Sequence, residues 1–177
     1  VYGGLMAALF EETGRYIAMR FLVKPMDFPN AFMYGAGHGG VEAMLLCGVA
    51  SISNIASAVM INSGTMSAQL ATLDAEKAAD TAAALSALWT TPSLTFFAGG
   101  VERIIAVVLH LSLSILVFQS IRKKSQKDLL NAYLFHFVID SLSVLLSAVA
   151  SVWMVELVVA LVTGGAVLMA KYACMEE

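Results

Sequence analysis

The sequence has 177 residues, of which 59% are hydrophobic and 13% charged, and its mean hydropathy is +0.82. Soluble globular domains are about 45–50% apolar and about 25% charged, so the composition excludes a water-soluble domain. A net charge of −3, with ten Lys and Arg, excludes the basic surface that nucleic-acid binding requires. The two cysteines, Cys47 and Cys174, are too few for a disulfide framework or a thiolate metal cluster.

The first apolar run covers residues 1–23 and contains Glu11, Glu12 and Arg15. It begins without a methionine or a charged leader, so we expect that an upstream segment has been removed. Two glutamates interrupt the run, which argues against a signal peptide and favours a membrane helix. Four more runs are long enough for the roughly 20 residues that cross a bilayer core: 32–61, 93–120, 129–152 and 154–172. We therefore predict an all-α bundle of about five transmembrane helices, forming one membrane domain over residues 1–177.

Residues 62–92 connect the second and third predicted spans. This stretch is rich in alanine and carries leucines at helical spacing, namely Leu70, Leu73, Leu85 and Leu88. The spacing predicts an exposed or interfacial helix, which serves either as a surface connector or as a lid over a site.

Positive charges sort to one side of the predicted spans. That side receives Arg20, Lys24, Arg122, Lys123, Lys124, Lys127 and Lys171, whereas the other side receives Lys77. Cytoplasmic loops collect Lys and Arg, so we expect the Arg122–Lys127 loop and the C-terminus to be cytoplasmic. The expected location is the cell membrane of a bacterium, with membrane lipid as the surrounding partner.

Ionisable residues within the predicted spans are the main functional signal. They are Glu11, Glu12, Arg15, His38, Glu42, Glu102, Arg103, His110, His136 and Asp140. A charged side chain at the centre of a membrane helix costs about 2.5–3.5 kcal/mol, so this many imply pairing or a water-filled cavity. A rise of 1.5 Å per residue puts most of them roughly 12–18 Å from the cytoplasmic end, and His38 somewhat shallower. Glu102 and Arg103 fall nearer the outer face, where a separate ion pair is expected.

Helical spacing predicts how these residues face. Side chains four apart share a helix face, which couples three pairs: Glu11 with Arg15, His38 with Glu42, and His136 with Asp140. A carboxylate one turn from a histidine can orient its ring in a metal site or a general-base site. The glycines around His38 permit either close helix approach or a ligand near the backbone: Gly35, Gly37, Gly39 and Gly40.

Three short motifs carry a resemblance to a known family. They are Glu11-Glu12 followed by Arg15, Tyr34 four positions before His38, and His136 four positions before Asp140. In this order they resemble the motifs of the CPBP (Abi, CAAX-processing) intramembrane proteases. The strings EETGRY, GHGGVE, ERIIAVVLH and HFVID are closer still to the YhfC family of intramembrane metalloproteases. His110 is additional to the broader family's motifs but fits the YhfC family.

The resemblance implies hydrolysis of a peptide bond within or near the membrane, with a peptide or membrane-protein substrate. Such a reaction needs a water, a base that deprotonates it, and a group that stabilises the oxyanion. We expect Glu11 to activate the water while Glu12 and Arg15 set the local electrostatics. Adjacent helical residues point about 100° apart, so one of the two glutamates faces the site while the other pairs elsewhere.

The histidines complete the expected site in one of two ways. In the first, His38 and His136 bind the water and the carbonyl oxygen, and Asp140 orients His136. In the second, His38, His110 and His136 hold a zinc ion that keeps a position open for the water, and Glu11 remains the base. The residues leave both versions open.

Two other functions are compatible with the same residues. Buried Glu, Asp and His also mark ion pathways, so a proton- or metal-coupled transporter is the first alternative, and it requires polar groups that continue to the outer face. A non-catalytic immunity or scaffold protein, in which the polar layer holds the helices together, is the second.

Overall fold

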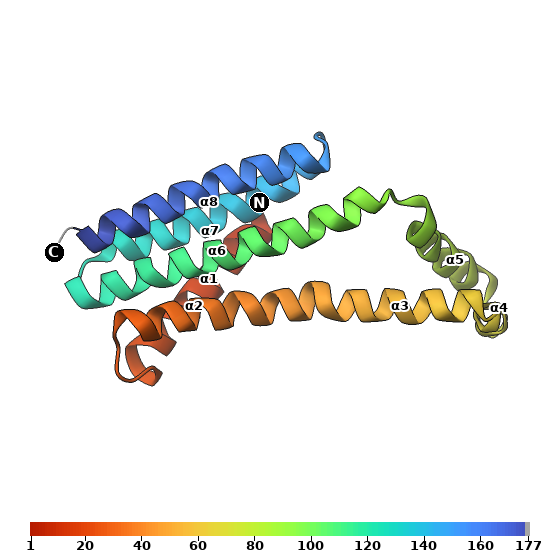
Figure 1. The fold of residues 1–177 in the computed structure, drawn as a ribbon, viewed down its shortest axis with the longest axis horizontal. Coiled ribbons are helices and arrows are strands. Elements are labelled where there is room, and N and C mark those ends of the chain that lie inside the picture. Colours follow the sequence, from red (N-terminus) through yellow and green to blue (C-terminus); the bar gives the residue numbers. More distant parts are fainter. Residues whose placement is uncertain (176–177) are drawn as a thin grey trace. The chain divides into compact units, whose positions relative to one another are not determined.

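The computed structural model describes residues 1–175, and these residues are helical with no strand among them. The α-helices are α1 (Tyr2–Ile17), α2 (Phe28–Ala43), α3 (Val49–Asn62), α4 (Thr65–Leu70), α5 (Ala75–Thr90), α6 (Ser93–Lys123), α7 (Gln126–Ser147) and α8 (Val152–Met175). Two π-helical turns continue helices: η1 (Ala18–Leu22) follows α1, and η2 (Met44–Gly48) joins α2 to α3 (Figure 1). The all-α prediction is confirmed.

Four helical segments are long and apolar enough to cross a membrane: Phe28–Asn62, Ser93–Lys123, Gln126–Ser147 and Val152–Met175. They coincide with the four later predicted spans, although the helix predicted to begin at 32 starts at Phe28. The helix predicted to end at 152 ends instead at Ser147. Helix α1 with η1 falls outside this set, and it carries Glu11, Glu12 and Arg15. The chain is therefore a helical membrane protein, and a fifth span through α1 stays a prediction.

By its internal contacts the chain divides into two compact units. Unit 1 comprises Val1–Ala43 and Val101 onward, and unit 2 comprises Met44–Gly100. In unit 2 the predicted helical connector forms two helices, α4 and α5. Asp74 caps the start of α5 by accepting a hydrogen bond from the Lys77 N–H at 2.9 Å. All the residues that the sequence singled out for a site lie in unit 1, whereas the prediction of a single domain stays untested.

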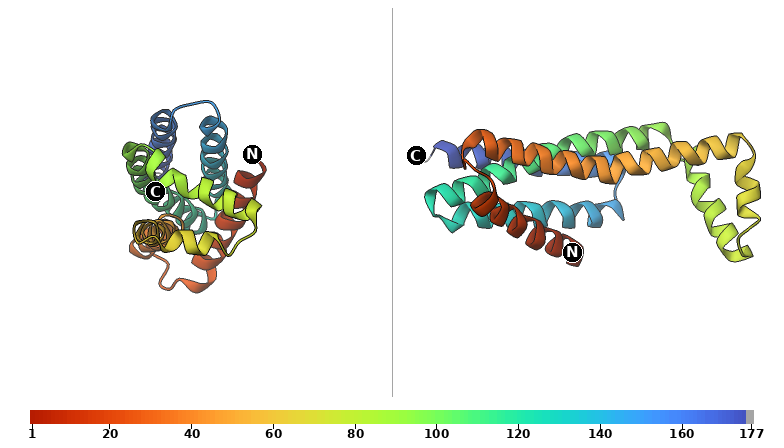
Figure 2. Two further views of the ribbon diagram at one scale, coloured as in Figure 1. Left: turned by 90° about the vertical axis from the view of Figure 1, so that its right-hand side faces the viewer. Right: turned by 90° about the horizontal axis from the view of Figure 1, so that it is seen from below.

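Within unit 1, α1 lies against α7 and α7 lies against α8, and the portion of α6 from Val101 runs beside them (Figures 1 and 2). Its core is built largely from α6, where Leu113, Leu116 and Val117 have no exposed surface. Large apolar side chains such as Leu134, Leu161 and Leu168 are exposed on the outside of the helices. This distribution is expected of a bundle whose outer surface contacts lipid tails, because the bilayer is as apolar as those side chains.

Two glycines of α2 allow its close approach to α6. A Cβ on Gly35 would lie 2.8 Å from the Leu111 Cα, and one on Gly39 would lie 3.0 Å from the Val107 Cα. No atom lies within 4 Å of the corresponding position at Gly37. Since Gly35 and Gly39 are one turn apart, they form the face on which α2 meets α6, and this contact brings His38 and Glu42 next to His110 of α6.

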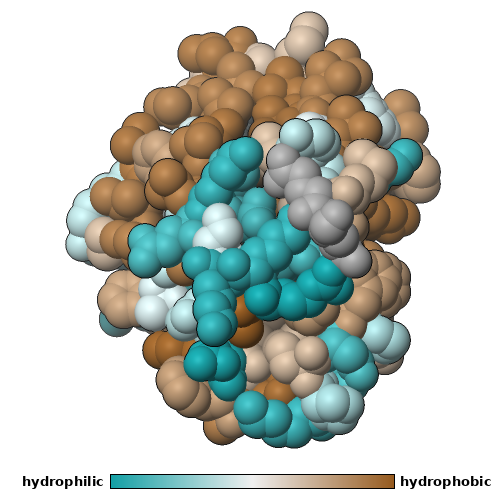
Figure 3. Space-filling view, turned by 90° about the vertical axis from the view of Figure 1, so that its left-hand side faces the viewer, coloured by the Kyte–Doolittle hydropathy of each residue, from teal (hydrophilic) through white to brown (hydrophobic). Residues whose placement is uncertain are grey.

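One end of unit 1 carries a hydrophilic patch (Figure 3). It carries the α1–α2 connection, the α6–α7 turn and the end of α8, with exposed basic residues Arg20, Lys24, Arg122, Lys124, Lys127 and Lys171. At the α6–α7 turn Lys124 adopts a left-handed φ of 53°, and the Ser125 side chain then accepts a hydrogen bond from the Lys127 N–H. The basic residues thus share one end, as their positions in the sequence indicate, and its cytoplasmic orientation stays a prediction.

Candidate active site

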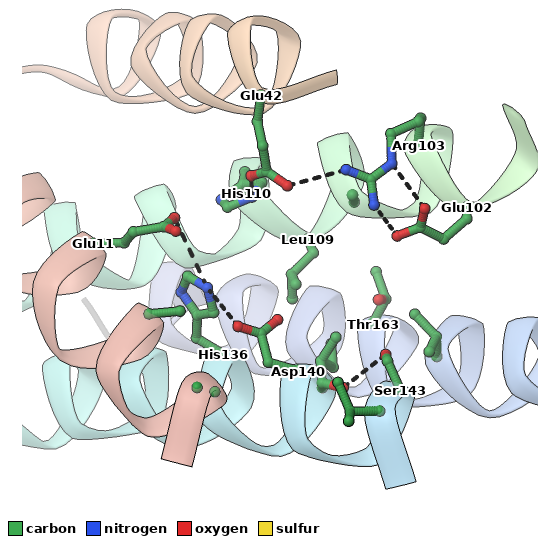
Figure 4. A pocket seen from close by; sticks show the side chains of 17 residues that line it. Glu11, Glu42, Glu102, Arg103, Leu109, His110, His136, Asp140, Ser143 and Thr163 are labelled. Carbon is green, nitrogen blue, oxygen red and sulfur yellow. Dashed lines mark hydrogen bonds and ion pairs between the residues drawn. The ribbon is translucent and has the colours of Figure 1, made fainter. Parts of the chain in front are cut away.

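A cavity of about 410 Å³ lies in unit 1 among α1, α2, α6, α7 and α8 (Figure 4). Its ionisable lining residues are Glu11, Glu42, Glu102, Arg103, His110, His136 and Asp140. These residues come from four helices, of which α1 and α2 lie near the start of the chain and α6 and α7 lie beyond residue 92. The ionisable residues that helix depth placed in one layer therefore line a common cavity.

His38 is not among the residues that line this cavity, but it contacts Glu11, which lines it. The Glu11 Oε2 lies 3.0 Å from the His38 Nε2 and 3.8 Å from the His136 Nε2. The Glu11 side chain retains 35% of its exposure, because it lies on the wall rather than behind it. One carboxylate oxygen from α1 therefore has imidazoles from α2 and α7 within reach.

Glu12 and Arg15 form a fully buried ion pair behind the wall. The Glu12 Oε2 is 3.0 Å from the Arg15 Nε, and both side chains have 0% exposure. The other Glu12 oxygen accepts a hydrogen bond from the His136 Nδ1 at 2.7 Å. The spacing predicted that Arg15 would pair with Glu11, but Arg15 pairs with Glu12. The guanidinium reaches the carboxylate three residues before it, since spacings of three and four both share a helix face.

Arg15 also ties α1 to α6. Its guanidinium donates to the His110 backbone carbonyl at 2.9 Å, to the Ser114 Oγ at 2.6 Å and to the His110 Nδ1 at 2.9 Å. A guanidinium has no acceptor atom, so the His110 Nδ1 must accept. A neutral His110 therefore carries its proton on Nε2.

Glu42 lies between His110 and Arg103. The Glu42 Oε2 is 2.5 Å from the His110 Nε2, and its Oε1 accepts a hydrogen bond from Arg103 at 3.1 Å. Arg103 also pairs with Glu102. The sequence put Glu42 on one helix face with His38, and ligand atoms of the two do lie within 4.8 Å of each other. The expected ion pair of Glu102 with Arg103 is present, but it is not separate from the site. The close approach of α2 to α6 takes Glu42 across to α6, so the Glu102–Arg103 pair is continuous with the site.

Asp140 lies near His136, as expected, but it is not the carboxylate that holds the imidazole ring. Its Oδ2 is 3.6 Å from the His136 Nε2, whereas the Nδ1 of that ring is bonded to Glu12. The predicted orientation of His136 by Asp140 is therefore corrected: Glu12 holds the ring. Because Nδ1 donates to Glu12, the Nε2 of a neutral His136 presents a lone pair toward the cavity, beside Glu11 and Asp140.

One group of donor atoms is close enough to hold a metal ion. Ligand atoms of Glu11, His38, Glu42 and His110 all lie within 4.8 Å of one another. The group contains two of the three histidines expected to bind zinc, and carboxylates take the place of His136. Imidazole and carboxylate are both zinc ligands, so the donor set fits this metal. Arg15 makes His110 the least suitable donor, because its contact with Nδ1 leaves the proton on Nε2.

Sequence reasoning missed two residues of this region. Glu42 entered only as a partner for His38, although it belongs to the donor group. Glu156 was not counted at all, yet it is a buried carboxyl residue in α8 with 8% exposure. Its signal was available in the sequence, because it is the only acidic residue in the apolar run 154–172.

The fold and this cavity define a helical membrane protein with a buried histidine–carboxylate centre. The family described as YhfC intramembrane metalloprotease matches residues 1–159, and the chain belongs to this family. It is also 38% identical over 165 residues to the membrane protein YhfC of Bacillus subtilis (strain 168). That match covers 92% of this chain and 63% of the relative, so the chain spans less than two thirds of the relative's length. No solved structure matches the chain.

Proposed function

We propose that the protein hydrolyses a peptide bond within or near the membrane, using a water activated by Glu11. The observation that carries this proposal is the Glu11 carboxylate on the cavity wall, 3.0 Å from one imidazole and 3.8 Å from another. A carboxylate within reach of a bound water, next to groups that can hold that water and the carbonyl, meets the geometric requirement for general-base hydrolysis. Membership of the family supports this class of reaction.

The different surroundings of the two glutamates favour Glu11 as the base. Both oxygens of Glu12 already contact positive or donating groups, one on Arg15 and one on His136, and its side chain is fully buried. Glu11 lines the cavity and has an oxygen directed at the two histidines. Glu12 and Arg15 therefore act from behind the wall: they hold His136 and supply the fixed charges around the reacting atoms.

The histidines bind the oxygens of water and substrate in this proposal. His136 offers the Nε2 lone pair to a water hydrogen, because Glu12 fixes its proton on Nδ1. The His38 Nε2, 3.0 Å from the Glu11 Oε2, donates a hydrogen bond to the carbonyl oxygen. The proton that Glu11 takes from the water goes to the leaving amine by way of the His136 Nε2. Asp140, 3.6 Å from that nitrogen, stabilises the imidazolium that forms on the way.

A zinc ion fits the same donors. Glu11, His38 and Glu42 would hold it most readily, since Arg15 keeps the proton on the ring nitrogen of His110 that faces them. In this version Glu11 would be a metal ligand instead of the free base, and the metal would activate the water. When bound, zinc would polarise the carbonyl and lower the pKa of a water.

The test is cleavage of a library of quenched fluorescent peptides by the detergent-purified protein. Glu11→Gln should abolish cleavage without changing the unfolding temperature, and Glu76→Gln, which removes an exposed carboxylate of unit 2, should leave cleavage unchanged. Retained activity in Glu11→Gln would refute the base. Metal content by elemental analysis, with and without a chelator, separates the two versions: less than about one zinc per chain with activity that survives chelation refutes the metal.

A second candidate function, a proton- or cation-coupled transporter, is favoured by one observation. Polar side chains continue from the Glu11 cavity past Glu102 to Glu156, as an ion pathway requires. Reconstitution into liposomes tests it, because a transporter would carry protons or divalent cations down a gradient without peptide hydrolysis.

A further inference from the structure

The wall of the Glu11 cavity continues into a second hollow of about 310 Å³. Glu102, Ser143 and Val159 line both, so the two spaces adjoin along α6, α7 and α8. On α7 the lining side chains follow one helix face from the catalytic end to the second hollow: His136, Asp140, Ser143 and Ser147. At 1.5 Å per residue, this face extends roughly 16 Å beyond His136.

Glu156 is the buried acid of the second hollow. It has 8% exposure, and its Oε2 has no hydrogen-bond partner among the described residues. Seven residues further along the same face of α8, the Thr163 hydroxyl lines the main cavity with 3% exposure and is likewise without a partner (Figure 4). A buried polar group without a partner costs about 1–3 kcal/mol, so these two atoms are arranged for a ligand that supplies hydrogen-bond donors.

Acidic residues outnumber Lys and Arg among the side chains that line the two hollows. Their carboxyl residues are Glu11, Glu42, Glu102, Asp140 and Glu156. Among the described residues that line them, Arg103 is the single Lys or Arg, and it is already bonded to Glu42 and Glu102. A metal ion at the Glu11 end would offset part of this charge but would leave Glu156 without a cation. The Glu156 end therefore attracts a positive group.

We infer that the second hollow is a substrate subsite that binds the positively charged side chain of a lysine or arginine, with Glu156 as its counter-ion. This inference rests on the proposed peptidase function and names its substrate class, a peptide with a basic residue near the cleaved bond. An extended chain covers about 3.3–3.6 Å per residue. Since the basic side chain itself spans part of the roughly 16 Å, the residue belongs about three to four positions from that bond.

The experiment compares peptides that are identical except for one position, which is lysine, norleucine or glutamate. That position is placed in turn at each of the four residues on either side of the cleaved bond. The wild type should cleave the best lysine peptide with a kcat/KM about 10-fold above that of its norleucine partner, mainly through KM. Glu156→Gln should reduce this ratio to below about 3-fold, whereas Glu76→Gln should preserve it. A ratio compared within one variant is insensitive to a general loss of folded protein.

Binding to the inactive variant tests the subsite without catalysis. Glu11→Gln should bind the labelled lysine peptide about 10-fold more tightly than the norleucine peptide, as measured by fluorescence anisotropy, and adding Glu156→Gln should remove the difference. If this preference holds but no peptide is cleaved, the peptidase proposal fails and the subsite stands. Glu11-dependent cleavage with a lysine-to-norleucine ratio near one overturns the subsite. Equal binding of the two peptides overturns it as well, as does Glu156-dependent cation flux in liposomes without peptide discrimination.

Discussion

Glu11 and Glu12 are neighbours in the sequence but belong to two different regions of unit 1. Glu12 lies in a buried layer with Arg15, where the two charges are paired and neither side chain lines the cavity. Glu11 lies on the cavity wall with Glu42 and keeps about a third of its exposure. The buried pair stabilises the fold and holds the His136 ring in place, whereas the cavity wall leaves the Glu11 carboxylate oxygens accessible to a substrate or water. Substitutions in the two regions should therefore fail in different ways.

The largest effect is expected on the wall. Glu11→Gln should lower the rate of peptide cleavage by about 10²–10⁴-fold, because a general base contributes about that much. Thermal unfolding in detergent should change little, since Gln keeps the volume and can still bond to His38. A large loss of stability in this variant would contradict the division between wall and layer.

Arg15→Met tests the buried layer. It leaves Glu12 charged without a counter-ion and removes the contacts that join α1 to His110 and Ser114. Breaking a buried pair from one side costs about 3–5 kcal/mol, so the unfolding temperature should fall sharply. Arg20→Met, at an exposed arginine beyond the last turn of α1, is the matched control and should be nearly neutral. Equal stability of the two variants would show that the layer does not hold the helices together.

The α2–α6 contact should respond to a single methyl group. Gly35→Ala places a Cβ 2.8 Å from the Leu111 Cα, so α2 must shift, and overpacking of this kind costs about 1–3 kcal/mol. Cleavage should fall as well, because the shift moves His38 relative to Glu11. Gly37→Ala meets no atom within 4 Å and should be neutral or slightly stabilising, since alanine favours helix more than glycine does. Circular dichroism melts and peptide cleavage on the two variants give the comparison.

The smallest effect is expected in unit 2, at the start of α5. Hydrogen bonds from the Lys77 side chain and backbone hold the pKa of the Asp74 carboxyl below its ordinary value of 3.8. A depressed pKa stabilises the folded form above that ordinary value, and the contribution is lost as the pH falls through the lower, folded-state pKa. Asp74→Ala should therefore lower the helicity of α5 slightly at pH 7 and have no effect at strongly acid pH. Peptide cleavage should be unchanged, and amide hydrogen exchange over 75–90 measures the difference.

The sequence alone determined the helical elements and most of the ionisable residues that line the cavity. Long apolar runs predicted the four spans to within a few residues, because about 20 apolar residues in helical geometry are what a bilayer requires. Ionisable residues in those runs identified the cavity wall, since their insertion cost demands a shared polar interior. Helical spacing also predicted neighbours within each helix, and it correctly put His38 near Glu42 and His136 near Asp140.

The tertiary structure decided the partners. Arg15 reaches Glu12 and the ring of His110, and Glu42 crosses to α6. Spacing along one helix cannot decide between such contacts, because the distance to another helix depends on how closely the two backbones approach. At α2 that approach is set by Gly35 and Gly39. Glu156 is a second example. The sequence shows an acidic residue in an apolar run. Its unpartnered oxygen and its position beside the Glu11 cavity arise only when α6, α7 and α8 pack together.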